Sequence, residues 1–262
     1  GMPKGALEDV DDILAELDFD VDDLDRSAVD KKAPKASDGA PISSAPSVPV
    51  TTARRSKELA ATPLSSALQR ARQGGSTLDL SHWSVRLKEA DWATLSNCLL
   101  EFDLKLTAVF LNSSDIGAKA ATALSKALSE NATVTKLDLS ANQLNDPGAG
   151  VLGQILVKNS TLRHLDVENN GIGHTGGVAL AEALAVNTTL QSLHLSDNSL
   201  TDASAGSLGT ALSTNRSLRT LWLDGNTIGV KGAQALSAAL GRNSTLHTLH
   251  IASPKPGSTI QR

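Results

Sequence analysis

The chain has 262 residues, of which 40% are hydrophobic, and a formal net charge of −4 at pH 7. No apolar run approaches the roughly 18 residues that a membrane-spanning helix needs, so the composition predicts no membrane partner. The single cysteine, Cys98, excludes a disulfide framework, and no basic and then apolar stretch follows Met2, so we predict a cytoplasmic protein.

The segment 1–26 combines an apolar stripe with strong negative charge. It holds ten acidic residues against Lys4 and Arg26, which gives a net charge of −8. Its apolar residues recur at spacings of three and four, as on one face of an amphipathic helix: Leu7, Val10, Leu14, Leu17, Val21 and Leu24. Because repulsion between like charges opposes an isolated helix, we predict that the segment folds on a basic partner, with Leu14 and Leu17 in contact. The alternative is an acidic tail that only aids solubility.

Residues 27–55 are rich in Ser, Pro, Ala and Lys and have no apolar period. Such a composition cannot bury enough apolar surface to offset the entropy of ordering, so we predict a disordered linker. Basic residues gather at Arg54, Arg55 and Lys57. A nucleic-acid site would also need interleaved aromatic residues or a basic face in the rest of the chain. The sequence has neither, and we predict no nucleic-acid partner.

A cap is predicted over residues 56–106, ahead of the regular repeats described next. In its first part, Leu64 and Leu68 lie at helical spacing. Its second part, residues 76–106, begins like a repeat but carries Trp83 where four later repeats have Asn. Stacked repeats need such covers, because the first core layer would otherwise face water.

Residues 107–251 consist of repeats of one length. Four of them open on TKLDLSANQL, RHLDVENNGI, QSLHLSDNSL and RTLWLDGNTI, and these openings begin 28 positions apart. Apolar and polar residues alternate in each opening, which predicts a short strand with one buried face. An Asn follows where the chain must turn off the sheet, and its amide can bond unpaired backbone groups there: Asn142, Asn170, Asn198 and Asn226.

The second half of each repeat changes to helical spacing. Ala149, Leu152 and Leu156 fall on one helical face, and the same pattern recurs in the following repeats. A second Asn column follows the helices, at Asn159, Asn187, Asn215 and Asn243. No repeat can bury its apolar face alone, so the repeats must stack. We therefore predict an α/β solenoid with a curved parallel sheet inside and helices outside.

The 28-residue period, the L-x-x-L-x-L-x-x-N-x-L opening and the full helix resemble the ribonuclease-inhibitor-like subclass of leucine-rich repeats. Tropomodulins, NOD-like receptors and Ran GTPase activators have similar repeats. The resemblance covers about residues 76–251. It implies the leucine-rich-repeat solenoid and a protein partner, because members of this subclass act nearly all by binding another protein.

The repeat pattern stops after a last strand, HTLHI, and the tail 252–262 cannot supply another helix. The last core layer is therefore predicted to be poorly covered. We expect this end to be a truncation, a seat for a partner's helix, or an association surface of the chain itself.

The residues between the buried leucines are predicted to point to the concave side of the sheet. They form one column with neighbours about 5 Å apart: Asp79, Phe110, Asp138, Asp166, His194, Trp222 and His250. Flanking positions add Asn112, Lys136, His164, Glu168 and Asp224. Phe110 and Trp222 stand out, because the repeat requires no apolar residue there and exposed aromatic residues beside charges are frequent in protein interfaces. We predict protein binding by Phe110, Asp138, His164, Asp166, Glu168, His194, Trp222, Asp224 and His250. The alternative is that the aromatic residues contact only each other, a tail or water.

We predict no catalytic site, no cofactor and no metal. His164, Asp166, His194 and His250 carry metal-ligating groups, but the ladder spacing should keep them apart along the sheet, without the converging geometry of a zinc site. The sequence contains no nucleophile elbow, phosphate loop or paired Cys–His motif. Cys98 lies in the apolar run NCLLEF, where a free thiol usually packs as a small hydrophobic group.

The chain is thus predicted to be a non-enzymatic adaptor or scaffold. It would bind one protein through the concave face and make a second contact through the acidic segment. The resemblance leaves two alternatives open: a regulator of small GTPases, and a cytoskeletal or ciliary structural component. Neither the catalytic residues of Ran GTPase activators nor the actin-binding motifs of tropomodulin are recognisable in this sequence. The predicted location is the cytoplasm, including its cytoskeleton.

Overall fold

The computed structural model describes residues 63–81, 87–100 and 105–252. The acidic segment with Leu14 and Leu17, the linker 27–55 and the tail 253–262 lie outside the described residues. In the ranges that are described, the helices are all too short or too polar to cross a membrane.

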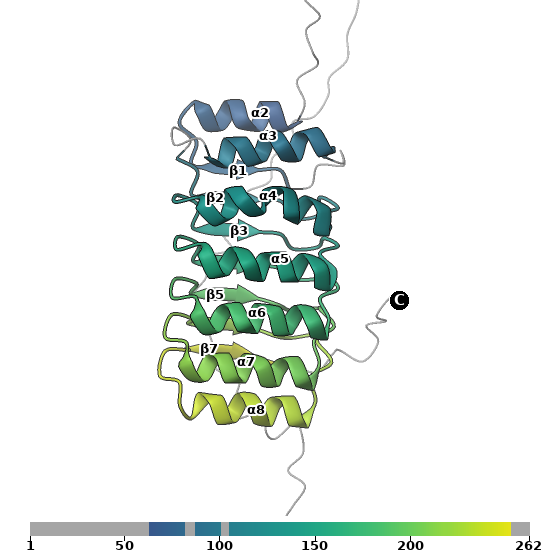
Figure 1. Cartoon of the computed structure of the whole chain (residues 1–262), viewed down its shortest axis with the longest axis vertical. Helices are drawn as coiled ribbons and strands as arrows, with labels where there is room; N and C mark the ends of the chain where they lie inside the picture. The colour runs from purple at the N-terminus through teal and green to yellow at the C-terminus, as the bar shows by residue number, and fades with distance from the viewer. Residues whose placement is uncertain (1–62, 82–86, 101–104, 253–262) are drawn as a thin grey trace, which may run out of the picture. The chain divides into compact units, whose positions relative to one another are not determined.

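Seven three-residue strands form one parallel sheet in the described part of the chain, and they follow one another in sequence order across it. They are β1 (Thr77–Asp79), β2 (Ala108–Phe110), β3 (Lys136–Asp138), β4 (His164–Asp166), β5 (Ser192–His194), β6 (Thr220–Trp222) and β7 (Thr248–His250). The helices stack beside one another on one side of this sheet (Figure 1). They are α2 (Pro63–Arg72), α3 (Glu89–Leu100), α4 (Ala118–Glu130), α5 (Asn145–Lys158), α6 (His174–Val186), α7 (Asp202–Thr214) and α8 (Val230–Leu240). This arrangement is the predicted leucine-rich-repeat solenoid.

The central residue of every strand is buried between the sheet and the helices. In β3, Leu137 is buried while Lys136 is exposed and Asp138 is partly exposed, and the same alternation recurs in its neighbours. Burying a leucine side chain stabilises the fold by roughly 1.5 to 3 kcal/mol. The strands therefore turn one face toward the helices and leave the first and third side chains on the other face.

Two columns of asparagine connect each repeat to the one before it. The side-chain amide of Asn198 donates to the carbonyl oxygen of Val167 at 3.0 Å, and its oxygen accepts from the backbone N–H groups of Asn170 and Ile172, each at 3.0 Å. After the helices, Asn187 donates to the carbonyl oxygen of Leu156 at 2.7 Å. The interpretation of the strand-end column as a partner for backbone groups at the turn is confirmed, and the column after the helices has a similar role.

The start of the described sheet is covered by α2 and α3. Leu64 and Leu68 of α2 are buried in the core, within the segment expected to be helical. Trp92 and Cys98 of α3 are buried as well. Cys98 has the packing role that the sequence predicted for it, and its thiol is not presented to solvent.

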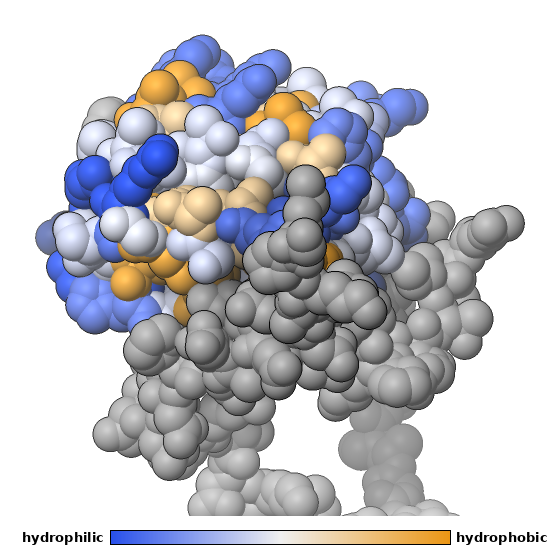
Figure 2. Space-filling view, turned by 90° about the horizontal axis from the view of Figure 1, so that it is seen from below, coloured by the Kyte–Doolittle hydropathy of each residue, from blue (hydrophilic) through white to orange (hydrophobic). Residues whose placement is uncertain are grey.

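The other end of the solenoid is less well covered. Ile228, Leu240 and Leu246 are only partly buried, although the residues one repeat earlier are fully buried. Figure 2 views the molecule from this end and shows hydrophobic side chains gathered among hydrophilic ones. Each inner repeat has a neighbour on both sides, whereas the last described repeat has one on a single side.

Candidate binding surface on the open face of the sheet

The sheet face turned away from the helices, called the open face below, carries two columns of side chains, most of which are exposed or partly exposed. In the ladder, Asp138 lies beside Asp166, and His194 lies between Asp166 and Trp222. The third residues of the strands thus form the column that the sequence predicted, which is Asp79, Phe110, Asp138, Asp166, His194, Trp222 and His250. The first residues form the second column, with Lys136 beside His164.

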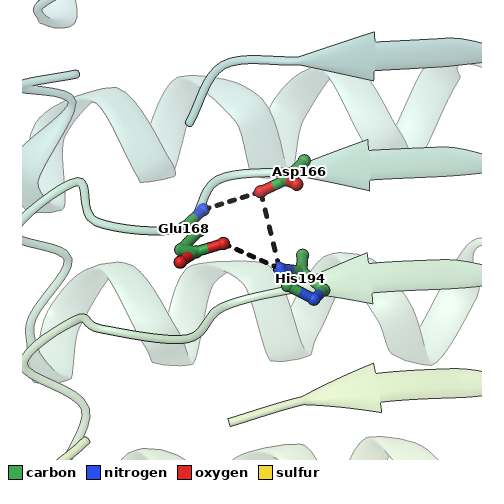
Figure 3. Close-up of side chains that lie close together, drawn as sticks. All are labelled: Asp166, Glu168 and His194. Carbon is green, nitrogen blue, oxygen red and sulfur yellow. Dashed lines mark hydrogen bonds and ion pairs between the residues drawn. The ribbon is translucent and has the colours of Figure 1, made fainter. Parts of the chain in front are cut away.

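Asp166, Glu168 and His194 converge on the open face, and we call them the acid–histidine cluster (Figure 3). Nδ1 of His194 lies 3.3 Å from Oε2 of Glu168 and 3.7 Å from Oδ1 of Asp166. The backbone N–H of Glu168 donates to Oδ1 of Asp166 at 3.0 Å, which orients that carboxylate. Asp166 and His194 end the adjacent strands β4 and β5, so the sheet register itself brings the two side chains together.

The cluster has more negative than positive character. Burial is the largest cause of a raised pKa for the Asp166 carboxyl, and the nearby charges of Asp138 and Glu168 raise it further. The hydrogen bond from the Glu168 backbone and the neighbouring His194 act in the opposite direction. This part of the face therefore favours a ligand or partner that brings positive charge.

His194, Trp222 and His250 form a row of rings across β5, β6 and β7, called the aromatic row below. The rings of Trp222 and His250 are stacked, with centroids 3.6 Å apart and an interplanar angle of 3°. The ring of His194 is tilted by 50° against Trp222, at a centroid distance of 4.9 Å. Because His194 belongs to both groups, the acid–histidine cluster and the aromatic row form one continuous patch.

The other predicted binding residues have different partners. Phe110 lies under the ammonium group of Lys136, which is 5.1 Å from the ring centroid, and strands β3, β4 and β5 separate it from Trp222. Oδ1 of Asp138 accepts from the backbone N–H of Ser140 at 2.9 Å, and Oδ1 of Asp224 accepts from the N–H of Ala252 at 2.9 Å. These two carboxylates therefore also hold turns of the backbone.

His164 stands apart from the acid–histidine cluster in charge as well as in position. Its pKa is lowered, first by burial and then by the positive charges of Lys136 and Arg163. Its imidazole is thus biased toward the neutral form. The first-residue column at β3 and β4 is basic where the third-residue column beside it is acidic.

One sequence-based argument is corrected by this geometry. We expected ladder spacing to keep His164, Asp166, His194 and His250 apart, but the ligand atoms of Asp166, His194 and Glu168 lie within 4.8 Å of one another. The 28-residue offset between Asp166 and His194 is the signal that could have revealed the pair. Glu168 lies beyond the end of β4, where the repeat period does not fix the direction of a side chain.

Comparisons with known proteins support the repeat fold. The family model described as TMOD/LMOD Leucine-rich domain matches residues 89–199. Two models of single leucine-rich repeats match residues 189–211 and 214–237. A comparison with curated proteins found no match.

Three solved structures are similar to the chain. A tropomodulin C-terminal domain from Caenorhabditis elegans has 21% identity and a TM-score of 0.50, over 58% of this chain and 93% of that one. Leiomodin-1 Actin-Binding Site 2 has 18% identity and a TM-score of 0.39, over 73% of this chain and 80% of that one. Internalin C2 from Listeria monocytogenes has 20% identity and a TM-score of 0.41, over 70% of this chain and 84% of that one.

The 28-residue period, the parallel strands in sequence order, the Asn columns and the matching repeat models agree with one another. Together they identify the chain as a leucine-rich-repeat protein.

Proposed function

We propose that the chain is a non-enzymatic protein-binding scaffold and that the patch around Trp222 on the open face is its binding surface. The observation that carries the proposal is the partly exposed Trp222, stacked on His250 at a position where the repeat requires no apolar side chain. Partly exposed aromatic residues of this kind are frequent hot spots, and each contributes roughly 2 kcal/mol or more to binding.

The charges beside the aromatic row indicate the chemistry of the partner. Asp138, Asp166 and Glu168 place carboxylates on the same face, and the pKa of Asp166 is raised first by its burial and then by the charges of Asp138 and Glu168. We infer that the partner presents a basic residue next to an apolar one. Arginine fits both demands, because a guanidinium group pairs with carboxylates and also stacks on aromatic rings.

Variants on the two sides of the solenoid test the open face. Proximity labelling in cells supplies candidate partners, and their affinities are then measured with purified wild type, Trp222→Ala and Val186→Ala. Val186 is 61% exposed at the end of α6, on the helix side, and serves as the control. We expect Trp222→Ala to weaken the specific partner about 30-fold, as the loss of roughly 2 kcal/mol implies. Equal affinities for Trp222→Ala and wild type would reject the open face as the binding surface.

A cytoskeletal partner is the second candidate, and the match of residues 89–199 to the TMOD/LMOD Leucine-rich domain favours it. One similar structure, of leiomodin-1, is an actin-binding site, which makes actin the first filament to examine. We expect the purified chain to pellet with actin filaments, and Trp222→Ala to remain in the supernatant. Absence of the wild type from both actin and microtubule pellets would exclude direct filament binding, while a soluble partner could still use the open face.

A second contact is proposed for the acidic segment 1–26, through Leu14 and Leu17. Two linked weak contacts raise overall avidity without any new chemistry. Deletion of residues 1–26 should weaken the partner selected by proximity labelling, and replacement of Leu14 and Leu17 by Ser should weaken it to a similar degree. If only the deletion has an effect, the segment acts through its charge and not as a helix.

A further inference from the structure

We propose that Asp166, Glu168 and His194 form a binding site for a divalent transition-metal ion, of which Zn²⁺ fits best. The site is built from one imidazole nitrogen and two carboxylate oxygens, and these are ligand types that Zn²⁺ accepts. The three ligand atoms lie within 4.8 Å of one another. In the described part of the chain, no other group of three or more such side chains is close enough to hold an ion.

The distances agree with ligands that surround one ion. Nδ1 of His194 is 3.3 Å from Oε2 of Glu168 and 3.7 Å from Oδ1 of Asp166. Two ligands of a tetrahedral zinc ion, each about 2.0 to 2.2 Å from the metal, are about 3.4 Å apart. Small rotations of the side chains would therefore bring all three atoms to coordination distance without any movement of the strands.

The imidazole nitrogen that faces the carboxylates has no other partner. Nδ1 of His194 is buried from solvent and has no hydrogen-bond partner in the part of the chain that the structure describes. An unprotonated Nδ1 would direct its lone pair at two negatively charged groups, which is unfavourable. Nδ1 therefore carries either a proton or a metal ion.

The surroundings also favour a cation at this place. Oδ1 of Asp166 is oriented by the Glu168 N–H at 3.0 Å, so one ligand is already held by the backbone. Asp138 lies beside Asp166 on the neighbouring strand and adds negative charge. On the far side of His194, the ring of Trp222 limits how far the imidazole can turn away. The site thus has a fixed carboxylate, a confined imidazole and an excess of acid.

Three protein ligands leave one tetrahedral position open. Water would fill it, and the bound ion would exclude the partner's arginine proposed above, because both need the carboxylates of Asp166 and Glu168. This exclusion rests on the proposed function of the open face, whereas binding of the ion by the chain alone does not.

The test uses the purified full chain without a polyhistidine tag, first stripped with a chelator and then titrated with Zn²⁺ or Co²⁺. We expect one equivalent of Zn²⁺ by calorimetry, and with Co²⁺ the strong visible absorption of a tetrahedral ion. His194→Ala should weaken Zn²⁺ binding at least tenfold and abolish the cobalt absorption, because even partners that only orient a ligand contribute 10- to 100-fold. Glu168→Gln should weaken binding as well.

His174→Ala is the matched control, since His174 is exposed at the start of α6 and lies outside the acid–histidine cluster. It should leave the affinity and the cobalt spectrum unchanged. Circular dichroism establishes that each variant is folded, and Asp166→Asn offers a second ligand change if His194→Ala is not. The absence of saturable uptake by the wild type would overturn the proposal, and so would Zn²⁺ binding that persists in folded His194→Ala and Asp166→Asn. No partner is needed, so the outcome is independent of whether a protein binds the open face.

Discussion

The strand-end Asn column and the third-residue column of the strands are four positions apart along the chain. They nevertheless differ in burial and in how much the residue type varies. The Asn column is buried, and each of its members donates to a carbonyl oxygen of the preceding repeat: Asn142 to Leu111, Asn170 to Leu139, Asn198 to Val167 and Asn226 to Leu195. The third-residue column is partly exposed and changes from Asp to His to Trp along the sheet.

This difference separates residues that maintain the fold from residues that are available for recognition. A buried turn exposes the same unpaired backbone groups in every repeat, so the same side chain must satisfy them each time. On the open face, Asp138 and Asp166 accept from backbone N–H groups two residues ahead, but the same position also accommodates His194 and Trp222, so the repeat does not require one side chain there. A residue there can vary in charge and size at little cost in stability, and the face acquires a pattern that a partner can recognise.

Breaking the Asn column should have the largest effect. Asn198→Ala removes the bond to Val167 and leaves the N–H groups of Asn170 and Ile172 without their acceptor in the core. Each buried group left unsatisfied costs about 1 to 3 kcal/mol, so we expect the free energy of unfolding to fall by roughly 3 kcal/mol or more. Urea denaturation measures it. Asn97→Ala, at an exposed position of α3, is the control and should change stability by less than about 0.5 kcal/mol.

A matched pair of glycines in α7 extends the comparison to the helices. A Cβ atom at Gly209 would lie 2.9 Å from the backbone oxygen of Ala235 in α8, whereas one at Gly206 would meet nothing within 4 Å. Gly209→Ala should therefore destabilise the protein by about 1 to 2 kcal/mol, because two helices must separate. Gly206→Ala should stabilise it by up to about 1 kcal/mol, since alanine loses less backbone entropy. Thermal unfolding measures both effects. Melting temperatures that change in the same direction in the two variants would contradict the close helix contact at Gly209.

The sequence predicted those features that repeat and missed those that depend on a single side chain. The Leu and Asn columns follow from the 28-residue period, because burial and backbone hydrogen bonding impose the same demand on every repeat. The convergence of Glu168 on His194 depends on how a side chain turns beyond the end of a strand. The register predicted which third residues are neighbours, but not that Phe110 would pair with Lys136 while Trp222 would stack on His250.

Helix capping also depends on contacts between repeats that sequence patterns do not reveal. Oδ1 of Asp146, in the first turn of α5, accepts from the N–H groups of Gly173 and Gly176 at the start of α6. Asp202 of α7 does the same for Gly229 and Gly232 of α8. These contacts recur every second repeat and join residues about one repeat apart, so local capping patterns within a single helix do not reveal them.

The aromatic row should make a smaller contribution to the free energy of unfolding, and urea denaturation of single and double variants can separate it. In a double-mutant cycle, Trp222→Ala and His250→Ala should show a coupling free energy of about 0.5 to 1.5 kcal/mol, as expected for stacked rings. The pair Trp222→Ala and Asp138→Ala, with no contact between the two side chains and two strands between them, serves as the control. Its effects should add to within about 0.5 kcal/mol. Zero coupling between Trp222 and His250 would mean that the stack does not organise the open face.

The smallest effect should come from a charge in the first-residue column. Lys136 lowers the pKa of His164, although burial contributes more. Lys136→Met should therefore raise the pKa of His164 while leaving it below its usual value, because the effect of burial remains. An NMR titration of the imidazole, with a chelator present to exclude metal ions, measures this shift, and Lys158→Met at the end of α5 should not produce it.

Loss of the contact between Lys136 and the Phe110 ring should change stability by less than about 1 kcal/mol. If Lys136→Met lowered the free energy of unfolding as much as Asn198→Ala does, the open face would also maintain the fold, and the distinction between the two columns would fail.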